Sequence, residues 1–346
     1  MKTLNSRQLR ILEFLKVSAP KSATEIENYL KGVSRATVNR DLELLLDENK
    51  IYKEGKGKNT EYFISKGYTY TKPYSIDYFY KNPAERDINP NYNQNITEEL
   101  ESIEIFSDEE VIRLEALTQK YRSNVKRLGT DVLKRELERV IIELSWMSSK
   151  IEGNTYSLIE TELLIEKNKV AEGKTKAETQ MILNHKDAIK YIVGNTEEFT
   201  KLTTIVVLKV HEVLIKDLES HGYRNSPVGI TGTLYRPLQK KEKLQKELDK
   251  IVDLINKKVL PFEKSLLANL LIAYLQPFKD GNKRTARIVG NALLLANTCS
   301  PLSLLTLDEE EYRRALLLFY EQNNLSLFKK IFLDQYNFAV ENYFLA

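Results

Sequence analysis

The side chains best suited to binding or catalysis lie in one stretch, Leu275–Asn291, which reads LQPFKDGNKRTARIVGN. One helix is expected to end near Tyr274 and the next to begin at about Lys283, so Asp280 and Gly281 fall in the turn between them. Free backbone N–H groups and the positive end of the helix dipole make a helix start suitable for phosphate. Gly281 lacks a side chain, which lets the backbone approach such an anion closely.

Charged side chains at the same turn strengthen the prediction of a phosphate site. Arg284 and Arg287 lie on one face of the expected helix, so both can bind the same anion. Asp280 offers hard oxygen ligands where a Mg²⁺ ion that bridges phosphates would sit. The simpler interpretation is a capped helix–loop–helix with two surface arginines. A turn glycine, an acid and two arginines at one helix start favour phosphate binding over it.

The segment from Gln276 to Arg287 resembles the signature loop of the Fic (Fido) family, HxFx(D/E)GNxRxxR. The matching positions are Phe278, Asp280, Gly281, Asn282, Arg284 and Arg287. Members of that family mostly transfer AMP from ATP to a hydroxyl side chain of a target protein. The resemblance implies a mainly α, Fic-type helical fold that uses ATP and Mg²⁺. It also implies a protein partner with a Ser, Thr or Tyr hydroxyl, which includes the chain itself, and a homodimer.

Further segments extend the resemblance from about residue 70 to the C-terminus. Ser148–Asn154 resembles the family's inhibitory helix, (S/T)xxxE(G/N), with matches at Ser148, Glu152 and Gly153. Residues 221–239 resemble the hairpin flap that holds a target segment as an added strand. The centre of that expected flap consists of Gly229, Ile230, Thr231 and Gly232. The segments around His185 and His211 resemble the family's scaffold helices.

The resemblance implies a role for each matching residue. Asp280 would bind Mg²⁺, and the backbone of Gly281 and Asn282 would line the anion hole. The outer phosphates would contact Arg284 and Arg287, with Lys283 beside them. The adenine would be bordered by Tyr320 and Asn323. Glu152 would pair with Arg287 and occupy the place of the γ-phosphate, because its carboxylate mimics the charge that an arginine prefers.

Gln276 stands where the family motif has histidine. The imidazole accepts the proton of the attacking hydroxyl, whereas an amide orients a hydroxyl without taking its proton. Loss of a general base typically slows a reaction by about 10²–10⁴-fold. The substitution fits an inactivated variant, a natural pseudoenzyme or a member with altered chemistry. ATP binding is expected in all three cases, since the phosphate-binding residues are present.

Lys283 is the second departure, because many members have glycine there. Lysine also occurs in the related Doc branch, which phosphorylates its target, so phosphotransfer remains an alternative. The three histidines, His185, His211 and His221, lie outside the loop. His221 leads into the expected flap as an exposed loop residue, and the other two are expected to be scaffold residues.

Residues 1–65 are expected to form a separate winged helix-turn-helix of three short helices and a hairpin. A basic and polar cluster stands at the start of the third helix, as in a recognition helix that meets DNA. Its members are Arg35, Thr37, Asn39 and Arg40. A winged helix used for protein contacts is the alternative. The chain could therefore also be a DNA-binding regulator whose second domain only senses ATP.

The remaining pattern describes the elements that position the site. A proline- and tyrosine-rich stretch, 66–106, is expected to be an ordered connector, and 107–346 a helical domain with the inhibitory helix near 145–154. Helices are expected at about 131–149, 158–168, 177–193, 204–217, 241–256, 263–275, 283–296, 308–321 and 325–342, with a small hairpin at 226–239. The 346 residues carry a net charge of +3 and one cysteine. With no signal-peptide pattern in the first residues, a cytoplasmic location is expected.

Overall fold

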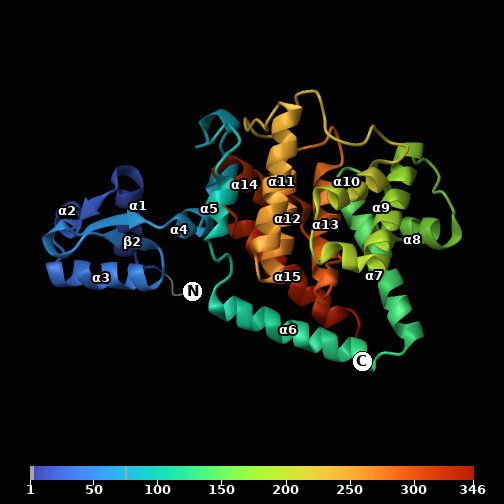
Figure 1. Cartoon of the computed structure of the whole chain (residues 1–346), viewed down its shortest axis with the longest axis horizontal. Helices are drawn as coiled ribbons and strands as arrows, with labels where there is room; N and C mark the ends of the chain where they lie inside the picture. The colour runs from blue at the N-terminus through green and yellow to red at the C-terminus, as the bar shows by residue number, and fades with distance from the viewer. Residues whose placement is uncertain (1–3, 75) are drawn as a thin grey trace. The chain divides into compact units, whose positions relative to one another are not determined.

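The computed structural model describes residues 4–74 and 76–346 and divides the chain into two compact units, Met1–Pro73 and Tyr74–Ala346 (Figure 1). The expected connector is therefore shared between them. Its first helix, α4 (Lys66–Thr71), belongs to the N-terminal unit, and the rest belongs to the second unit.

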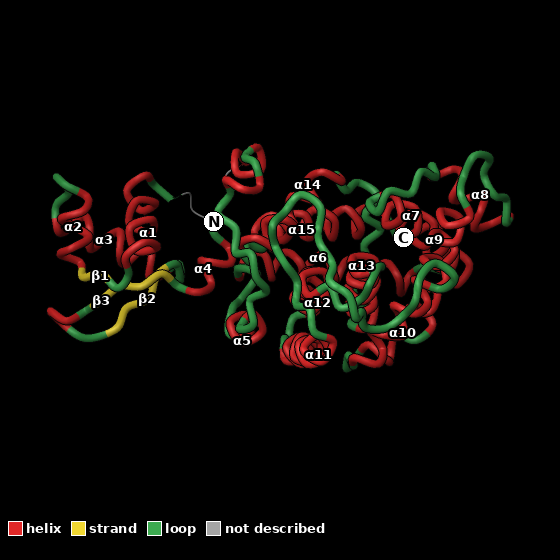
Figure 2. The backbone as a smooth tube through the Cα atoms, turned by 90° about the horizontal axis from the view of Figure 1, so that it is seen from above, coloured by secondary structure: helices red, strands yellow, loops and turns green. Residues whose placement is uncertain are grey.

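The N-terminal unit combines helices with a small antiparallel sheet of order β1-β3-β2. Its elements before α4 are α1 (Ser6–Ser18), β1 (Lys21–Ser22), α2 (Ala23–Leu30), α3 (Arg35–Asp47), β2 (Ile51–Glu54), the 3₁₀ segment η1 (Gly57–Asn59) and β3 (Glu61–Ile64). Strands are confined to this unit in the described chain, as Figure 2 shows in yellow. A capping box of Ser22 and Glu25 starts α2.

One apolar cluster holds this unit together. Ile11 from α1, Ile26 from α2, Val38 from α3 and Ile51 from β2 are all buried in it, and Tyr68 of α4 packs beside them. The three helices and the β2–β3 hairpin occur where the sequence predicts them, whereas the pairing of β1 with β3 was not predicted. The assignment of this layout as a winged helix stays a prediction.

The second unit is helical. Its helices are α5 (Ile96–Glu101), α6 (Asp108–Arg127), α7 (Thr130–Lys150), α8 (Leu158–Lys167), α9 (Lys176–Gly194), α10 (Thr204–Ile215), α11 (Lys241–Lys257), α12 (Pro261–Leu275), α13 (Asn282–Ala296), α14 (Glu309–Gln322) and α15 (Ser326–Asn342). Short 3₁₀ segments add η2 (Ile76–Tyr80), η3 (Pro83–Glu85) and η4 (Thr196–Phe199). Helices α7 to α15 confirm the nine predicted ranges to within about two residues, because capping residues and apolar periodicity mark most of their ends.

Helices α12 and α13 form the centre of the second unit, and α7, α9 and α10 pack beside α13 (Figure 1). Gly290 allows the close approach of α12, because a Cβ there would lie 2.0 Å from Nδ2 of Asn269. That amide nitrogen already donates to the Ser265 carbonyl at 2.9 Å. The loop between α12 and α13 is thus supported by two buried, tightly packed helices.

The predicted hairpin at 226–239 is wrong. The described residues of this segment form no strand; the bridges near it join Tyr223 to Phe278 and Arg236 to Asn91. The backbone N–H of Arg236 donates to the Pro90 carbonyl, outside the segment, and that of Arg224, which precedes the segment, donates to the Pro277 carbonyl. The buried Arg224 guanidinium donates to the carbonyls of Ser226 and Leu238, so one side chain joins the two arms that strand pairing would have joined. We call residues 222–239 the flap segment.

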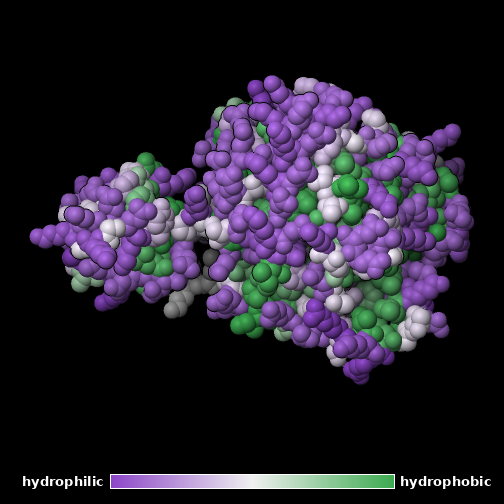
Figure 3. All heavy atoms as spheres, in the orientation of Figure 1, coloured by the Kyte–Doolittle hydropathy of each residue, from purple (hydrophilic) through white to green (hydrophobic). Residues whose placement is uncertain are grey.

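The face of the protein drawn in Figure 3 is mostly hydrophilic, with scattered hydrophobic patches. Among the described residues, no helix combines the length and the apolar character needed to cross a membrane.

Candidate active site

The loop between α12 and α13 owes its shape to two residues with left-handed backbone. Gln276 ends α12 at φ 51°, and Gly281 precedes α13 at φ 77°, a conformation that favours glycine. Asn282 closes the loop because its Oδ1 accepts from the Phe278 N–H and its Nδ2 donates to the Phe278 carbonyl, both at 2.9 Å. The side chain of Asn282 is thus occupied, and its backbone at the helix start is the part available to an anion.

His211 of α10 supports the loop from below. Its ring stacks on Phe278 with centroids 3.7 Å apart. Nε2 donates to the Asp280 carbonyl at 3.0 Å, so Nδ1 is the acceptor that faces the N–H of Gly222. Burial, together with the positive charge of Arg284, lowers the pKa of His211 to about 4, although its bond to Asp280 opposes this. This neutral ring organises the loop.

Charged groups line the mouth of the loop. The Asp280 carboxylate accepts from the N–H of Gly281 at 2.6 Å and from Nη2 of Arg284 at 2.7 Å. Its side chain is 60% exposed, whereas that of Arg284 is 2% exposed. Nη1 of Arg284 is buried and has no hydrogen-bond partner among the described residues. A buried donor without a partner is costly, so this nitrogen marks a place prepared for an acceptor.

Arg287, one turn further along α13, points to the end of α7. Its Nη2 donates to Oε1 of Glu152 and to the Ser148 carbonyl, both at 2.9 Å. Its Nε donates to the Ser148 hydroxyl at 2.9 Å, and Nη1 contacts the Tyr312 hydroxyl at 3.4 Å. The Arg287 side chain is 1% exposed, so its charge needs this set of acceptors.

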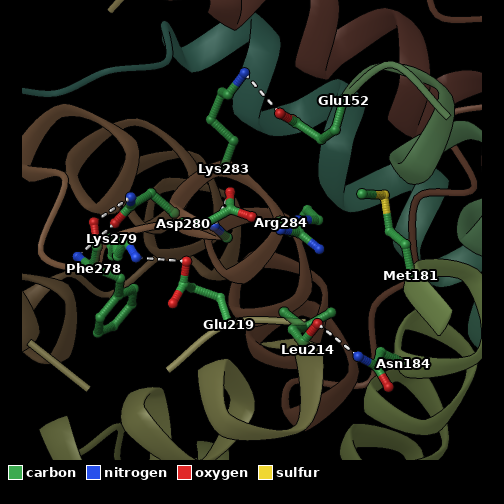
Figure 4. Close-up of polar contacts among 12 residues, drawn as sticks. Glu152, Met181, Asn184, Leu214, Glu219, Phe278, Lys279, Asp280, Lys283 and Arg284 are labelled. Atoms are coloured by element: carbon green, nitrogen blue, oxygen red, sulfur yellow. Dashed lines mark hydrogen bonds and ion pairs between the residues drawn. The ribbon is translucent and has the colours of Figure 1, made fainter. Parts of the chain in front are cut away.

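Glu152 receives a second cation. Lys283 Nζ lies 2.8 Å from Oε2 of Glu152, so each carboxylate oxygen faces a different positive group. Figure 4 shows Lys283 pointing toward Glu152, with Asp280 beside Arg284. Burial alone would raise the pKa of Glu152, but Arg287 and Lys283 outweigh it and lower this pKa to about 2. Glu152 is therefore an anion that occupies the cationic end of α13.

A buried histidine lies behind this pair. Nε2 of His185 from α9 is 2.9 Å from the Ser148 hydroxyl, and Nδ1 is 2.9 Å from the Met181 carbonyl. His185 is fully buried. Burial, followed by the charge of Arg284, lowers the pKa of His185 to about 3, so the ring is neutral.

Two cavities meet above the loop. The first, of about 360 Å³, is polar and includes Asp280, Gly281, Lys283 and Arg284 in its lining. The second, of about 430 Å³, has apolar walls from Leu316, Leu317 and Tyr320 of α14 and from Ile151 and Ile230. Glu152, Gly229, Gln276 and Lys283 line both cavities, which makes them one continuous cleft. An anion-binding end beside an apolar end is complementary to the two halves of a nucleotide, its phosphates and its base.

The structure brings most of the predicted residues together. The residues that line at least one cavity are Glu152, Gly153, Gly229, Ile230, Thr231, Gln276, Asp280, Gly281, Asn282, Lys283, Arg284 and Tyr320. Ser148 and Arg287 lie directly behind Glu152. Gly232, at φ 86°, sits next to Leu317.

Asn323 lines neither of these two cavities, and its expected place beside an adenine stays a prediction. It ends α14 in the left-handed conformation, and its amide contacts the Phe319 carbonyl and Asn93. The helix end turns this side chain toward the connector. The Gln276 side chain bonds to its own helix, because its Nε2 donates to the Ala273 carbonyl at 2.6 Å.

Sequence reasoning missed two buried arginines that support the site. Arg224 donates from Nε to the Gln276 carbonyl at 2.7 Å and so fastens the flap segment to the loop. Arg86 of the connector pairs with Glu321 at 3.2 Å and donates to the Gly232 carbonyl. No local pattern marks them, because their partners are distant along the chain.

The described residues hold no group of three or more His, Cys, Asp or Glu side chains that could enclose a metal ion. Mg²⁺ is commonly held by one or two carboxylates together with substrate phosphates. Asp280, half-open to the cleft and adjacent to the anion cavity, fits that mode of binding.

Comparison with known proteins places the site in context. The sequence model of the Fic/DOC family matches residues 201–294, which contain the whole loop. The chain is 27% identical over 192 residues to a protein adenylyltransferase Fic of Nematostella vectensis, which covers 53% of this chain and 44% of that protein. It is also 27% identical over 218 residues to the Aedes aegypti protein of the same name, which covers 60% of this chain and 43% of that one. The chain thus spans less than half the length of these curated relatives.

Solved structures share the fold. Fic-1 from C. elegans (residues 134 to 508) superposes with a TM-score of 0.60 at 20% identity, over 68% of this chain and 71% of that one. A Fic domain-containing signaling protein from Bacteroides thetaiotaomicron gives a TM-score of 0.57 at 20% identity, over 66% and 95% of the two chains.

Proposed function

Because the chain belongs to the Fic/DOC family, we propose that it binds Mg·ATP in the cleft above the α12–α13 loop and transfers AMP to a hydroxyl group of a protein. Glu152 restrains this reaction, and Gln276 limits its rate. The observation that carries the proposal is the cationic end of α13, where buried Arg287 holds a carboxylate and buried Arg284 keeps a nitrogen without a partner.

The residues present fit the phosphates of ATP. The backbone at Gly281 and Asn282 would line the anion hole, and Arg284 and Arg287 would hold the outer phosphates, with Arg287 at the terminal one. Asp280 would hold Mg²⁺, which neutralises phosphate charge during the transfer. Leu317 and Tyr320 give the base an apolar wall. Lys283, freed from Glu152, would add a further positive charge.

The flap segment and Gln276 would act on the target. Gly229, Ile230 and Thr231 line the cleft and offer a backbone edge that an extended peptide can join. Gln276 sits between the two cavities, where it can orient the attacking hydroxyl by a hydrogen bond. Since an amide takes no proton, the hydroxyl proton must pass to water or to the departing phosphate groups, and the reaction is slow.

Glu152 restrains the reaction by occupying the position of a terminal phosphate. Its two oxygens use the cations that the phosphate requires, and its pKa of about 2 keeps it charged at neutral pH. ATP must either displace this carboxylate or bind with its outer phosphates turned away.

The test is incubation with Mg·ATP followed by mass spectrometry of the intact protein. The combined variant Gln276→His with Glu152→Gly is expected to gain an AMP-sized adduct on itself or on an added protein. Arg287→Ala in that background is the matched control and should abolish the adduct. No adduct on any protein, despite ATP binding, would contradict the transferase proposal.

Two alternatives have their own supporting observations. A Doc-like phosphotransfer is favoured by Lys283 and would give a phosphate-sized adduct in the same experiment. An ATP-sensing DNA regulator is favoured by Gln276 and by exposed Asn39 and Arg40 on α3. It would bind duplex DNA in a salt-sensitive manner and form no adduct.

A further inference from the structure

A chain of hydrogen bonds runs from the core of the second unit to the cleft. It starts at the Met181 carbonyl, passes through both ring nitrogens of His185 and the Ser148 hydroxyl, and continues through Arg287 to Glu152. These bonds are each 2.9 Å long. Three helices contribute to it, α7, α9 and α13, so its geometry depends on tertiary packing.

The direction of each bond follows from the donors available. Arg287 can only donate, so the Ser148 oxygen accepts from its Nε and must direct its own proton elsewhere. A carbonyl can only accept, so Nδ1 of His185 carries the ring proton and faces Met181. Nε2 therefore has a free lone pair, and it accepts a hydrogen bond from the Ser148 hydroxyl. Only the neutral His185 tautomer with its proton on Nδ1 gives every group in this chain of hydrogen bonds a suitable donor or acceptor.

We propose that His185 is a positioning residue for the nucleotide site, because it fixes the Ser148 hydroxyl as an acceptor and thereby aims the Arg287 guanidinium at the cleft. The inference rests on the proposed function, in which Arg287 contacts the terminal phosphate of ATP. Without His185, the Ser148 proton would lack a buried acceptor and the hydroxyl would rotate. Arg287 would then lose the hydrogen bond from its Nε to the Ser148 hydroxyl, which fixes the plane of its guanidinium group.

The location of His185 distinguishes it from an ordinary core histidine. Both its ring nitrogens form hydrogen bonds, and one of them bonds to Ser148 of α7, the helix that ends two residues before Glu152. The hydroxyl of Ser149 also lies 3.2 Å from Nδ1, so α7 contacts this ring twice. A histidine that only filled space would leave the orientation of Arg287 unaffected.

Two variants of similar size separate the functions of the two nitrogens. Gln places an amide oxygen near the Nε2 position, so His185→Gln keeps an acceptor for Ser148. Asn reaches only the Nδ1 position, so His185→Asn keeps a donor for Met181 and removes the acceptor. Both are examined with Glu152→Gly, which leaves Arg287 free for a phosphate, and the affinities for Mg·ATP and for AMP are measured by calorimetry.

We expect His185→Asn to weaken ATP binding about tenfold, as loss of one hydrogen bond to a charged group would. AMP, which lacks the terminal phosphate, should bind within about twofold of the parent, and His185→Gln should stay close to the parent for both nucleotides. Equal losses for ATP and AMP, or equal effects of Asn and Gln, would overturn the proposal.

A second measurement needs no nucleotide. In the otherwise unchanged chain, the losses of unfolding free energy caused by His185→Asn and Glu152→Gln should not add up in the double variant. Both substitutions remove an interaction of the same side chain, Arg287: the first removes its fixed hydroxyl acceptor, and the second removes its carboxylate partner. Additive effects would overturn the positioning role. Non-additive effects with no ATP binding by any variant would support the positioning role and reject the proposed function, so the two failures are distinguishable.

Discussion

The ion pairs of Glu152 make a strong prediction about stability. Glu152→Gln keeps the size of the side chain and removes its charge. In the folded protein, burial is outweighed by Arg287 and Lys283, and the pKa falls from 4.5 to about 2. Each pKa unit corresponds to about 1.4 kcal/mol, so the charge stabilises the fold by about 3 kcal/mol at neutral pH.

The lowered pKa also fixes the direction in which the stabilisation by Glu152 changes with pH. A carboxylate with a lowered folded pKa stabilises fully above its unfolded value, and this contribution is lost as the pH falls toward about 2. The stabilities of the parent and Glu152→Gln should therefore differ at pH 7 and converge below about pH 4.5. Urea unfolding followed by the fluorescence of Trp146, the single tryptophan, measures this in the unit that contains Glu152.

Glu309→Gln is the matched control. Glu309 pairs with Lys150 at 2.8 Å, a distance equal to that between Glu152 and Lys283, but both side chains are about 40% exposed. Solvent screens such a pair, so its loss should change stability little. Mg·ATP should also stabilise Glu152→Gln more than it stabilises the parent, whereas AMP should not discriminate. An unchanged unfolding free energy at pH 7, or a difference as large at pH 3 as at pH 7, would refute the reasoning.

Three further predictions concern the rest of the molecule. Gly290→Ala should lower the unfolding free energy by roughly 1–3 kcal/mol, because an added methyl overpacks the α12–α13 contact; urea titration measures it. His185 and His211 have pKa values lowered by burial to about 3 and about 4, so the unfolded chain binds more protons below pH 6.5. Stability should therefore fall between pH 7 and pH 5, by less in His185→Gln, and a flat profile would contradict this. If the N-terminal unit binds duplex DNA, Arg40→Ala should weaken binding and reduce its salt dependence in fluorescence anisotropy; an unchanged affinity would count against α3 as the contact.

Local patterns in the sequence determined most of the secondary structure. Capping residues such as Ser107 and Ser157 and the apolar stripes that follow them mark helix starts within a residue or two. The α12–α13 loop could also be predicted, because a turn glycine, an acid and two arginines stand within a few residues of one another. These features depend on interactions between residues that are close in the sequence, so they can be predicted from the sequence alone.

Only the tertiary structure decided which groups face one another across the chain. The Lys283–Glu152 pair, the His185–Ser148 bond and the bond from Arg224 to the Gln276 carbonyl join residues on different helices or loops. The hairpin expected at 226–239 did not form: the Arg236 N–H bonds to Pro90 of the connector, and the N–H of Arg224, just before the segment, bonds to Pro277 of the α12–α13 loop. Buried polar groups must find partners wherever packing places them, so the same side chain stays on a surface or becomes part of a site according to its neighbours in space.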